Sequence, residues 1–501
     1  MKIELTGDDL TLEQFEQVVL GRARVSLGVR ARKNIQRARD VVARAVAENK
    51  TVYGVTTGFG DLARMKIAPE QLRQVQVNLL RSHASGVGEP LSETETRAVL
   101  LLRANVLAKG FSGVRQEVVE NLVALLNREI YPVIPCRGSV GASGDLAPLS
   151  HLALVLIGEG EAVVDGERMS GAWALKRAGL KPLELEAKEG LALINGTQPS
   201  LAVGLLAWLE ARNLMDTADV AAALSLDALR GTPVAFDERI HKLRPLPGQL
   251  KSAAHVRELN AGSQIRESHI DCGKVQDAYS LRCVPQVHGA VREALGFVRR
   301  IFEVELNAGT DNPLVFAEQR EVISGGNFHG QPLALALDVL AIALAQLGNI
   351  SERRTERLIN PTLSDLTPFL TRQPGLHSGF MMAQVTAAAL ASENKGLAHP
   401  ASVDSIPTSG NEDFVSMSMG AALKARQVAD NVKTILAIEL LCACQGIDLL
   451  APLKTGKLAA QAHAAVRRVV PTLEADRILA PDIDAIRKLI SEGTLQRLVS
   501  S

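Results

Sequence analysis

The chain has 501 residues, and its 55 Lys and Arg side chains balance 55 Asp and Glu side chains. A chain of this length can form one large core or two fused domains. Because the formal net charge is zero and no basic stripe stands out, we expect no nucleic-acid partner.

Helix-capping patterns mark two predicted helices in the first hundred residues. Thr11 and Gln14 have the spacing of a capping box, and Gly21 stands where the first helix would end. Ser92 and Glu95 repeat the pattern ahead of a long apolar run. Each pair predicts a helix that begins directly after its Thr or Ser.

The remaining elements divide the chain into a mixed N-terminal part and a helical remainder. A helix is predicted over about 29–49, and the Asp165-Gly166 dipeptide predicts a small hairpin. Alanine- and leucine-rich stretches then predict long, closely packed helices near 201–230, 280–307, 329–359, 379–397 and 416–448. We therefore expect an N-terminal part over 1–195 and a helical bundle over 196–501.

The apolar runs and the cysteines indicate in which cellular compartment the protein is expected. The run at 333–350 is interrupted by polar residues and rich in alanine, so it predicts a buried bundle helix rather than a membrane span. Five cysteines are too few for a disulfide framework, and no secretory signal is evident, so we expect a cytoplasmic protein. Cys442 and Cys444 are expected to be buried as small hydrophobic residues. The ten histidines form no metal-binding motif, and no metal is expected.

A glycine-rich loop, GSVGASGDLAPLSH, occupies residues 138–151. Its G-x-x-G-x-x-G spacing matches neither common phosphate-binding loop, and no βαβ pattern surrounds it. Taken alone, such a loop is most often a tight turn with positive φ at its glycines. A third interpretation is chemical and concerns the triplet Ala142-Ser143-Gly144.

The triplet can cyclise through its own backbone. The amide nitrogen of Gly144 attacks the carbonyl carbon of Ala142, and loss of one water closes a five-membered ring. Loss of a second water, from Ser143, leaves an exocyclic methylene. Glycine leaves its nitrogen free to approach, serine supplies the leaving hydroxyl, and alanine is small enough for the turn. The product, 4-methylidene-imidazol-5-one, is a strong electrophile that needs no external cofactor.

The loop resembles the signature of the aromatic amino acid ammonia-lyases and aminomutases, which carry this ring as a prosthetic group. Seven further motifs are similar to family motifs and follow in order, so the resemblance covers nearly the whole chain. They are YGVTTGFG (53–60), RSHASGVGEPL (81–91), ALINGTQ (192–198), VQDAYSLRC (275–283), SGGNFHGQP (324–332), ISERRTERLINP (350–361) and NEDFVSM (411–417).

The resemblance implies a mainly α fold, a long helical bundle of the aspartase/fumarase-like type with a mixed N-terminal part. It implies a carbon–nitrogen lyase that removes ammonia from an α-amino acid to give an arylacrylate. It also implies a homotetramer whose active sites combine residues of several chains. The expected partners are therefore an amino acid substrate and further copies of this chain, with neither nucleic acid nor membrane.

Two tyrosines and an arginine match family positions that perform or support the chemistry. The resemblance implies that Tyr53 and Tyr279 are catalytic and that Tyr53 is the base for the β-proton of the substrate. Arg282 follows Tyr279 by three residues, so the two share a face if this segment is helical. Arginine can grip a carboxylate through two hydrogen bonds, and the family uses this position in that way.

Other matched positions surround the substrate. The resemblance places Asn195 near the electrophile, where it assists the polar end of the substrate, and its place before Gly196 also suits a turn. Gln276 and Phe328 are implied as further pocket residues, one polar and one lining the aromatic side.

His83 and Glu412 match the members of the family that act on histidine. Both side chains can hydrogen-bond an imidazole ring, whereas a phenyl ring would leave them unpaired at a cost of about 1–3 kcal/mol per group. The sequence therefore predicts conversion of L-histidine to trans-urocanate and ammonia, the first step of histidine breakdown. The sequence departs from the histidine pattern at Phe414, where a histidine is usual, and at Ala278, where a proline is usual. The alternative is a tyrosine or phenylalanine ammonia-lyase, or an aminomutase, of the same family.

Two rival classes are less consistent with the sequence. The fumarase and aspartase group is also helical and eliminative, but its G-S-S-x-M-P-x-K-x-N loop is absent here. A helical scaffold without catalytic activity would explain the long helices. It would not explain the Ala-Ser-Gly loop and its accompanying motifs.

Overall fold

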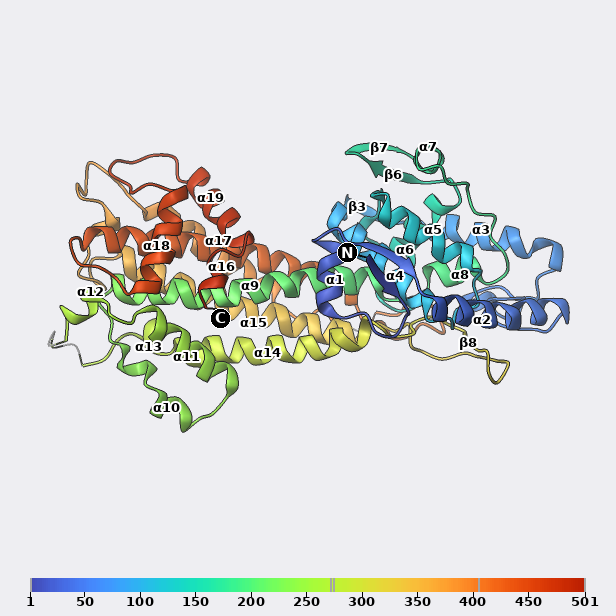
Figure 1. The fold of residues 1–501 in the computed structure, drawn as a ribbon, viewed down its shortest axis with the longest axis horizontal. Coiled ribbons are helices and arrows are strands. Elements are labelled where there is room, and N and C mark those ends of the chain that lie inside the picture. The colour runs from blue at the N-terminus through green and yellow to red at the C-terminus, as the bar shows by residue number, and fades with distance from the viewer. Residues whose placement is uncertain (1, 271–272, 274, 404–405, 500–501) are drawn as a thin grey trace. The chain divides into compact units, whose positions relative to one another are not determined.

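The computed structural model describes residues 2–270, 273, 275–403 and 406–499. The chain divides into two compact units, one formed by residues 1–206, 300–337 and 400–423 and the other by 207–299, 338–399 and 424–501. The long helices that have residues in both units are α9 (Gln198–Ala228), α14 (Val284–Glu305), α15 (Gln331–Ile359) and α17 (Ser418–Leu449) (Figure 1). The two domains predicted from the sequence, divided after residue 195, stay a prediction.

The first unit combines short strands with helices. Strands β1 (Lys2–Leu5) and β2 (Arg24–Leu27) pair in parallel. The antiparallel pairs are β3 (Val87–Pro90) with β5 (Pro135–Arg137), β4 (Ile130–Pro132) with β6 (Glu161–Val164), β6 with β7 (Glu167–Ser170), and β8 (Leu314–Phe316) with β9 (Glu321–Ile323). The helices are α1 (Leu12–Val19), α2 (Val29–Ala47), α3 (Leu72–His83), α4 (Glu93–Ala108), α5 (Gln116–Asn127), α6 (Leu146–Leu156), α7 (Gly171–Arg177) and α8 (Glu189–Ile194).

The local signals read from the sequence form as predicted. Thr11 caps α1 and Ser92 caps α4, each in a complete capping box. The hairpin between β6 and β7 turns at Asp165 and Gly166, whose φ angles are 51° and 78°. A two-residue turn with two positive φ angles matches the twist of the strands that it joins.

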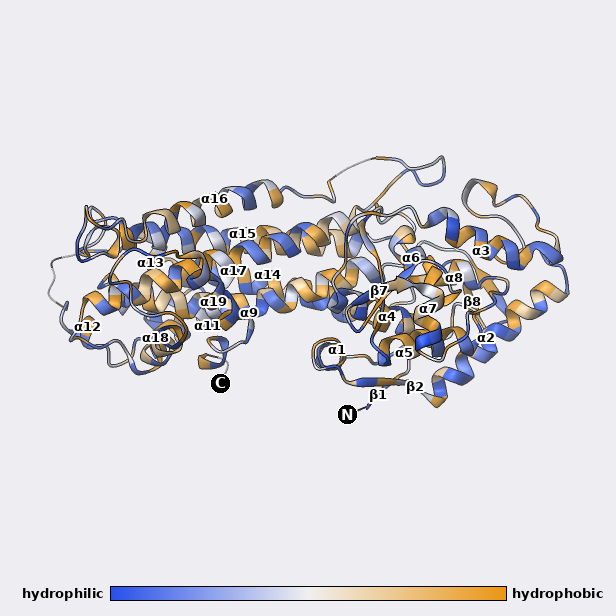
Figure 2. Cartoon of the chain, turned by 90° about the horizontal axis from the view of Figure 1, so that it is seen from above, coloured by the Kyte–Doolittle hydropathy of each residue, from blue (hydrophilic) through white to orange (hydrophobic). Residues whose placement is uncertain are grey.

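Helix α4 lies at the centre of the first unit. Its residues from Glu95 to Ala108 are buried, and it packs against α1, α2 and α5. Helix α2 is amphipathic: Ile35, Ala38 and Val42 are buried, whereas charged residues such as Arg37 and Asp40 are exposed (Figure 2). The prediction of a mainly α fold with a mixed N-terminal part is confirmed.

The second unit is a helical bundle. Besides parts of the long helices it contains α10 (Glu238–Lys242), α11 (Pro247–Leu259), α12 (Gln264–Glu267), α13 (Tyr279–Arg282), α16 (Met381–Leu397), α18 (Lys457–Val469) and α19 (Ala480–Ser491). Trp208 of α9 donates a hydrogen bond to the carbonyl of Leu295 in α14. A fully buried ion pair between Arg354 and Glu439 joins α15 to α17.

The long helices form close to their predicted ranges, with one difference. The segment predicted as one helix over 280–307 is two helices, α13 and α14, which are separated at Cys283. Pro285 stands at the second position of α14 and has no N–H to continue the hydrogen-bond ladder of α13. The break therefore follows from the proline.

Burial explains the apolar features of the second half of the chain. Among the described residues, only α15 is long and apolar enough to cross a membrane, and 72% of its most apolar stretch is buried within the structure. This burial agrees with the predicted bundle helix. Cys442 and Cys444 are both completely buried, as predicted, and burial raises the pKa of the Cys444 thiol to about 12. Cys272 lies outside the described residues.

Candidate active site

A cavity of about 970 Å³ in the first unit gathers most of the predicted site residues. Its lining includes Tyr53, His83, Ala142, Ser143, Asn195, Phe328 and Glu412. These residues come from segments as far apart in sequence as the loop after Lys50 and the segment before α17. Gln276, Tyr279 and Arg282 belong to the second unit and are not among the lining residues.

The glycine-rich loop runs from the end of β5 to the start of α6, and its backbone requires glycine. Gly138, Gly141 and Gly144 have φ angles of 137°, 67° and 70°. A Cβ atom on Gly144 would lie 2.2 Å from the carbonyl oxygen of Gly196. The loop is thus the tight, positive-φ turn that its composition predicts, and it places Ala142 and Ser143 at the cavity.

Two other segments hold the loop in place. The backbone N–H of Met417 donates to the carbonyl of Val140 at 2.7 Å. The carbonyl of Gly141 accepts from the hydroxyl of Ser416 at 2.9 Å and from the N–H of Gly330 at 3.1 Å. Fixing both carbonyls leaves the following triplet with little freedom to change its conformation.

Asp145 anchors the other end of the loop, and the sequence analysis assigned it no role. Its completely buried carboxylate accepts from the hydroxyl of Ser139 at 2.6 Å, and from the N–H and hydroxyl of Ser200 at 2.8 and 2.9 Å. Burial raises the pKa of Asp145, and these hydrogen bonds act in the opposite direction. The side chain joins the loop to the first turn of α9.

Ser143 and Glu412 meet at the cavity. The hydroxyl of Ser143 donates to one carboxylate oxygen of Glu412 at 3.3 Å, and Thr408 donates to the other at 2.9 Å. The residue predicted to become the electrophile is therefore in contact with the residue predicted to bind imidazole. Thr408 is a supporting residue that the sequence analysis did not identify.

His83 is the last residue of α3, and its ring is oriented by the helix backbone. Its Nδ1 lies 2.9 Å from the carbonyl oxygen of Leu79 and 2.9 Å from the hydroxyl of Ser82. Because a carbonyl oxygen can only accept, we assign the ring proton to Nδ1. In the neutral ring Nε2 then has a free lone pair for a ligand.

Aromatic residues form another part of the lining. Phe328 lines the cavity, as predicted, and so does Phe414. The ring of Phe414 stacks on His329 with centroids 5.9 Å apart, and His329 Nε2 lies 3.1 Å from the carbonyl of Phe414. The departure from the histidine pattern at Phe414 is thus located at the cavity itself.

Tyr53 lies in the loop between α2 and α3. Its hydroxyl accepts a hydrogen bond from the N–H of Gly60 at 3.3 Å, and its own proton remains available to another partner. Gly54 has φ of 65°, and a Cβ there would lie 2.4 Å from Leu191. This close approach holds the tyrosine loop against α8.

Asn195 follows α8 and is supported by charges that the sequence analysis did not identify. Its side-chain N–H groups donate to Asp311 and to the carbonyl of Asn312, at 3.4 and 3.0 Å. Lys188 pairs with Asp311 at 2.7 Å, and Arg103 donates to the backbone carbonyl of Asn195 at 3.0 Å. Burial lowers the pKa of Lys188 despite the opposing effect of Asp311, and burial lowers that of Arg103 to about 10.

The carboxyl of Glu305, in the first unit, should make the free energy of unfolding depend on pH. Burial raises the pKa of this carboxyl, at the end of α14, to about 7 from an ordinary 4.5, although the proximity of Thr197 lowers it. Between these pH values the folded state retains a proton that the unfolded state loses. Stability should therefore fall as pH rises from about 4.5 to about 7, and then level off. Thermal unfolding across pH 4–9 should show a flatter profile for Glu305→Gln. An unchanged profile would remove Glu305 as the cause.

The motif in the second unit forms the geometry predicted for it. Tyr279 and Arg282 lie in α13, and the guanidinium is 4.7 Å from the centroid of the tyrosine ring. Tyr279 is 70% exposed and Val275 is 92% exposed. The shared face predicted from the three-residue spacing is confirmed. Within one chain, however, these residues do not contribute to the cavity lining.

The polar groups of the cavity lining are hydroxyl, imidazole, amide and carboxylate groups, and they lie among apolar side chains. Among the residues that the structure describes, no group of three or more His, Cys, Asp or Glu side chains is placed to hold a metal ion.

Comparison with known proteins gives matches over the full length. The sequence profile of the aromatic amino acid lyase family matches residues 10–468. A histidine ammonia-lyase from Koribacter versatilis (strain Ellin345) is 58% identical, with 98% of each chain covered. The crystal structure of histidine ammonia-lyase from Trypanosoma cruzi is 46% identical, with a TM-score of 0.92 over 100% of this chain and 95% of that one. A tyrosine aminomutase from Streptomyces globisporus is 41% identical, with a TM-score of 0.94 over 100% and 98% of the two chains.

Proposed function

Since the chain belongs to the aromatic amino acid lyase family, we propose that it is a lyase converting L-histidine to trans-urocanate and ammonia. The observation that supports histidine as the substrate is that His83 and Glu412 line the same cavity as Ser143. The high sequence identity to histidine ammonia-lyases over the full length supports the same assignment over the tyrosine and phenylalanine alternative. The reaction is the first step of histidine breakdown.

The proposed prosthetic group is 4-methylidene-imidazol-5-one, formed from Ala142, Ser143 and Gly144. The loop suits it, because Gly144 has the required positive φ with no space for a Cβ, and Ser143 is half-buried at the cavity. When formed, the ring supplies an electrophilic carbon for the amino group of the substrate. No external cofactor and no metal ion form part of the proposal.

The side chains of the first unit bind the imidazole ring of the substrate and remove its β-proton. Glu412 and the Nε2 of His83 are hydrogen-bond acceptors; a neutral imidazole ring offers its one N–H to either of them, and a protonated ring offers an N–H to each. Phe328 packs beside the ring. Tyr53, once its hydroxyl has given up its own proton, takes the proton from the β-carbon through its phenolate oxygen, the step for which a positioned base is needed. Elimination then releases ammonia and leaves the double bond of the product.

Residues of the second unit complete the site from neighbouring subunits. We infer a cytoplasmic homotetramer in which Gln276, Tyr279 and Arg282 of one chain reach the cavity of another. The exposure of Tyr279 and the absence of all three residues from the cavity lining of their own chain support this arrangement. Arg282 then holds the carboxylate of the substrate in two hydrogen bonds.

Subunit mixing should demonstrate the shared sites. Tyr53→Phe and Arg282→Ala should each be nearly inactive, because each removes one essential group from every site. Coexpressed variants should regain activity, because some sites then combine an intact Tyr53 with an intact Arg282 from different chains. Random pairing would restore about a quarter of the sites. Activity of the mixture no higher than the sum of the two variants would contradict shared sites.

Product analysis tests the reaction itself. Purified protein incubated with L-histidine should release ammonia and form an arylacrylate with its ultraviolet absorbance, in equal amounts. Accumulation of a β-amino acid instead would identify an aminomutase. Absence of any product would contradict the proposed function.

A further inference from the structure

A buried ion pair contacts the side chain of Asn195. The ammonium of Lys188 and the carboxylate of Asp311 are 2.7 Å apart, and their side chains are 0% and 1% exposed. Asp311 also lies within 3.4 Å of the side-chain nitrogen of Asn195. A charged pair so completely removed from water carries a large desolvation cost, so its place beside a cavity residue calls for an explanation.

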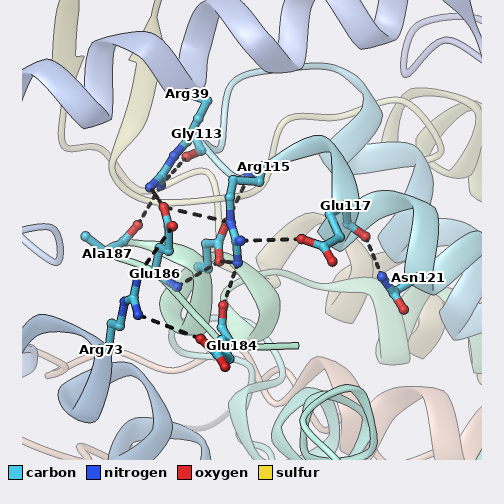
Figure 3. A network of polar contacts seen from close by, with 10 residues as sticks. Arg39, Arg73, Gly113, Arg115, Glu117, Asn121, Glu184, Glu186 and Ala187 are labelled. Carbon is cyan, nitrogen blue, oxygen red and sulfur yellow. Dashed lines mark hydrogen bonds and ion pairs between the residues drawn. The ribbon is translucent and has the colours of Figure 1, made fainter. Parts of the chain in front are cut away.

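The segment before α8 is fixed so that Lys188 can reach Asp311. Lys188 has a left-handed backbone, with φ of 77°. On one side of it Arg39 donates to the carbonyl of Ala187 at 3.0 Å (Figure 3). On the other side Arg115 pairs with Glu189 at 2.8 Å. Contacts of both arginines thus fix the residues on either side of Lys188, whose own backbone conformation is uncommon.

The ion pair determines whether the nitrogen or the oxygen of the Asn195 amide is left without a protein partner. The side-chain nitrogen has two N–H groups, and they are taken by Asp311 and by the carbonyl of Asn312, at 3.4 and 3.0 Å. Both partners can only accept, so the reversed amide orientation would place oxygen against oxygen. The amide oxygen of Asn195 is buried and has no hydrogen-bond partner among the described residues.

We propose that Lys188 and Asp311 are positioning residues, which orient Asn195 so that it acts toward the substrate only as a hydrogen-bond acceptor. A carboxylate offers no hydrogen, so Asn195 serves the amino group of the amino acid. Arg282 is left to serve the carboxylate. The identity of the substrate rests on the proposed function, whereas the acceptor role rests on the contacts of Asn195.

Two analogues of histidine, each lacking one of these groups, test separately the binding of the amino group by Asn195 and of the carboxylate by Arg282. Histamine has the imidazole and the amine but no carboxylate, and imidazolepropionate has the imidazole and the carboxylate but no amine. Both are to be measured as competitive inhibitors of the intact enzyme. In Asp311→Asn the new amide turns its oxygen toward Lys188, so Asn195 loses the acceptor that Asp311 provides and only the carbonyl of Asn312 still holds its amide nitrogen.

The inhibition constant of histamine should then rise about tenfold in Asp311→Asn, while that of imidazolepropionate changes less than about twofold. Arg282→Ala is the matched control and should show the opposite selectivity. Equal weakening of both analogues in Asp311→Asn would indicate a merely structural role and overturn the proposal. Weak binding of both analogues to the unmodified enzyme would instead count against the proposed substrate.

Asn195→Ala shows whether the ion pair acts through Asn195. It should weaken histamine selectively, and adding Asp311→Asn to it should weaken histamine no further. Additive losses would contradict the proposal. If Asp311→Asn does not fold because it leaves the charge of Lys188 without a counter-charge, Lys188→Met with Asp311→Leu removes both charges and the acceptor for Asn195, and should show the same selectivity with a smaller loss. Absence of any selectivity in that folded double variant would also contradict the proposal.

Discussion

Ser143→Ala should abolish the reaction while leaving the fold intact. The hydroxyl of Ser143 is the group lost as the second water during ring formation, and alanine has no such group. Its hydrogen bond to Glu412, at 3.3 Å, is long, and the side chain is only half-buried, so the free energy of unfolding should change little. We expect a fall in kcat of roughly a thousandfold or more.

Mass spectrometry links this loss of activity to the ring. The peptide containing residues 136–149 of the unmodified protein should weigh two waters less than its sequence mass. The corresponding peptide of Ser143→Ala should lack that deficit. Ser150→Ala is a suitable control, because Ser150 only donates to the carbonyl of Leu146 within α6 and should keep both the deficit and the activity. A full sequence mass in an active preparation would refute the proposed prosthetic group.

The second large effect concerns the imidazole-binding residues. His83→Leu removes a hydrogen-bond partner and adds apolar surface, so kcat/KM for histidine should fall by roughly 10- to 100-fold. Turnover of phenylalanine or tyrosine should rise in the same variant. Glu412→Gln keeps the size of the side chain and should also affect histidine more than an apolar substrate.

Arg282→Ala is the comparison for both substitutions, because every α-amino acid has the carboxylate that Arg282 is proposed to hold. It should lower kcat/KM for histidine, tyrosine and phenylalanine by a similar factor. Parallel losses for all three substrates in His83→Leu would show that His83 does not read the imidazole ring.

Local structure was predictable where the signal lies within a few residues. The capping boxes at Thr11 and Ser92 and the turn at Asp165 depend only on neighbouring residues, and each forms as predicted. The separation of α13 from α14 was not predicted. The apolar pattern continues through it, but Pro285 interrupts the backbone ladder.

The supporting residues of the site were not predictable in the same way. Lys188 and Asp311 are separated by 123 residues, and Asp145 and Ser200 by 55, so only the folded chain brings each pair together. Arg103 did leave a signal, as a single charge inside the apolar run of α4 that must be hydrogen-bonded if buried. Tyr279 and Arg282 of α13 were named only through the family resemblance, and within one chain they are not among the residues that line the cavity.

Comparing kcat/KM for L-histidine, L-tyrosine and L-phenylalanine on the unmodified protein tests the central claim most directly. Phe414 lies at the cavity where a histidine is usual, so this comparison also shows whether that ring alters the preference. We predict that histidine is preferred by at least about tenfold, which is about 1.4 kcal/mol of transition-state binding. A preference of that size for tyrosine or phenylalanine would contradict the histidine assignment and leave the lyase assignment in place.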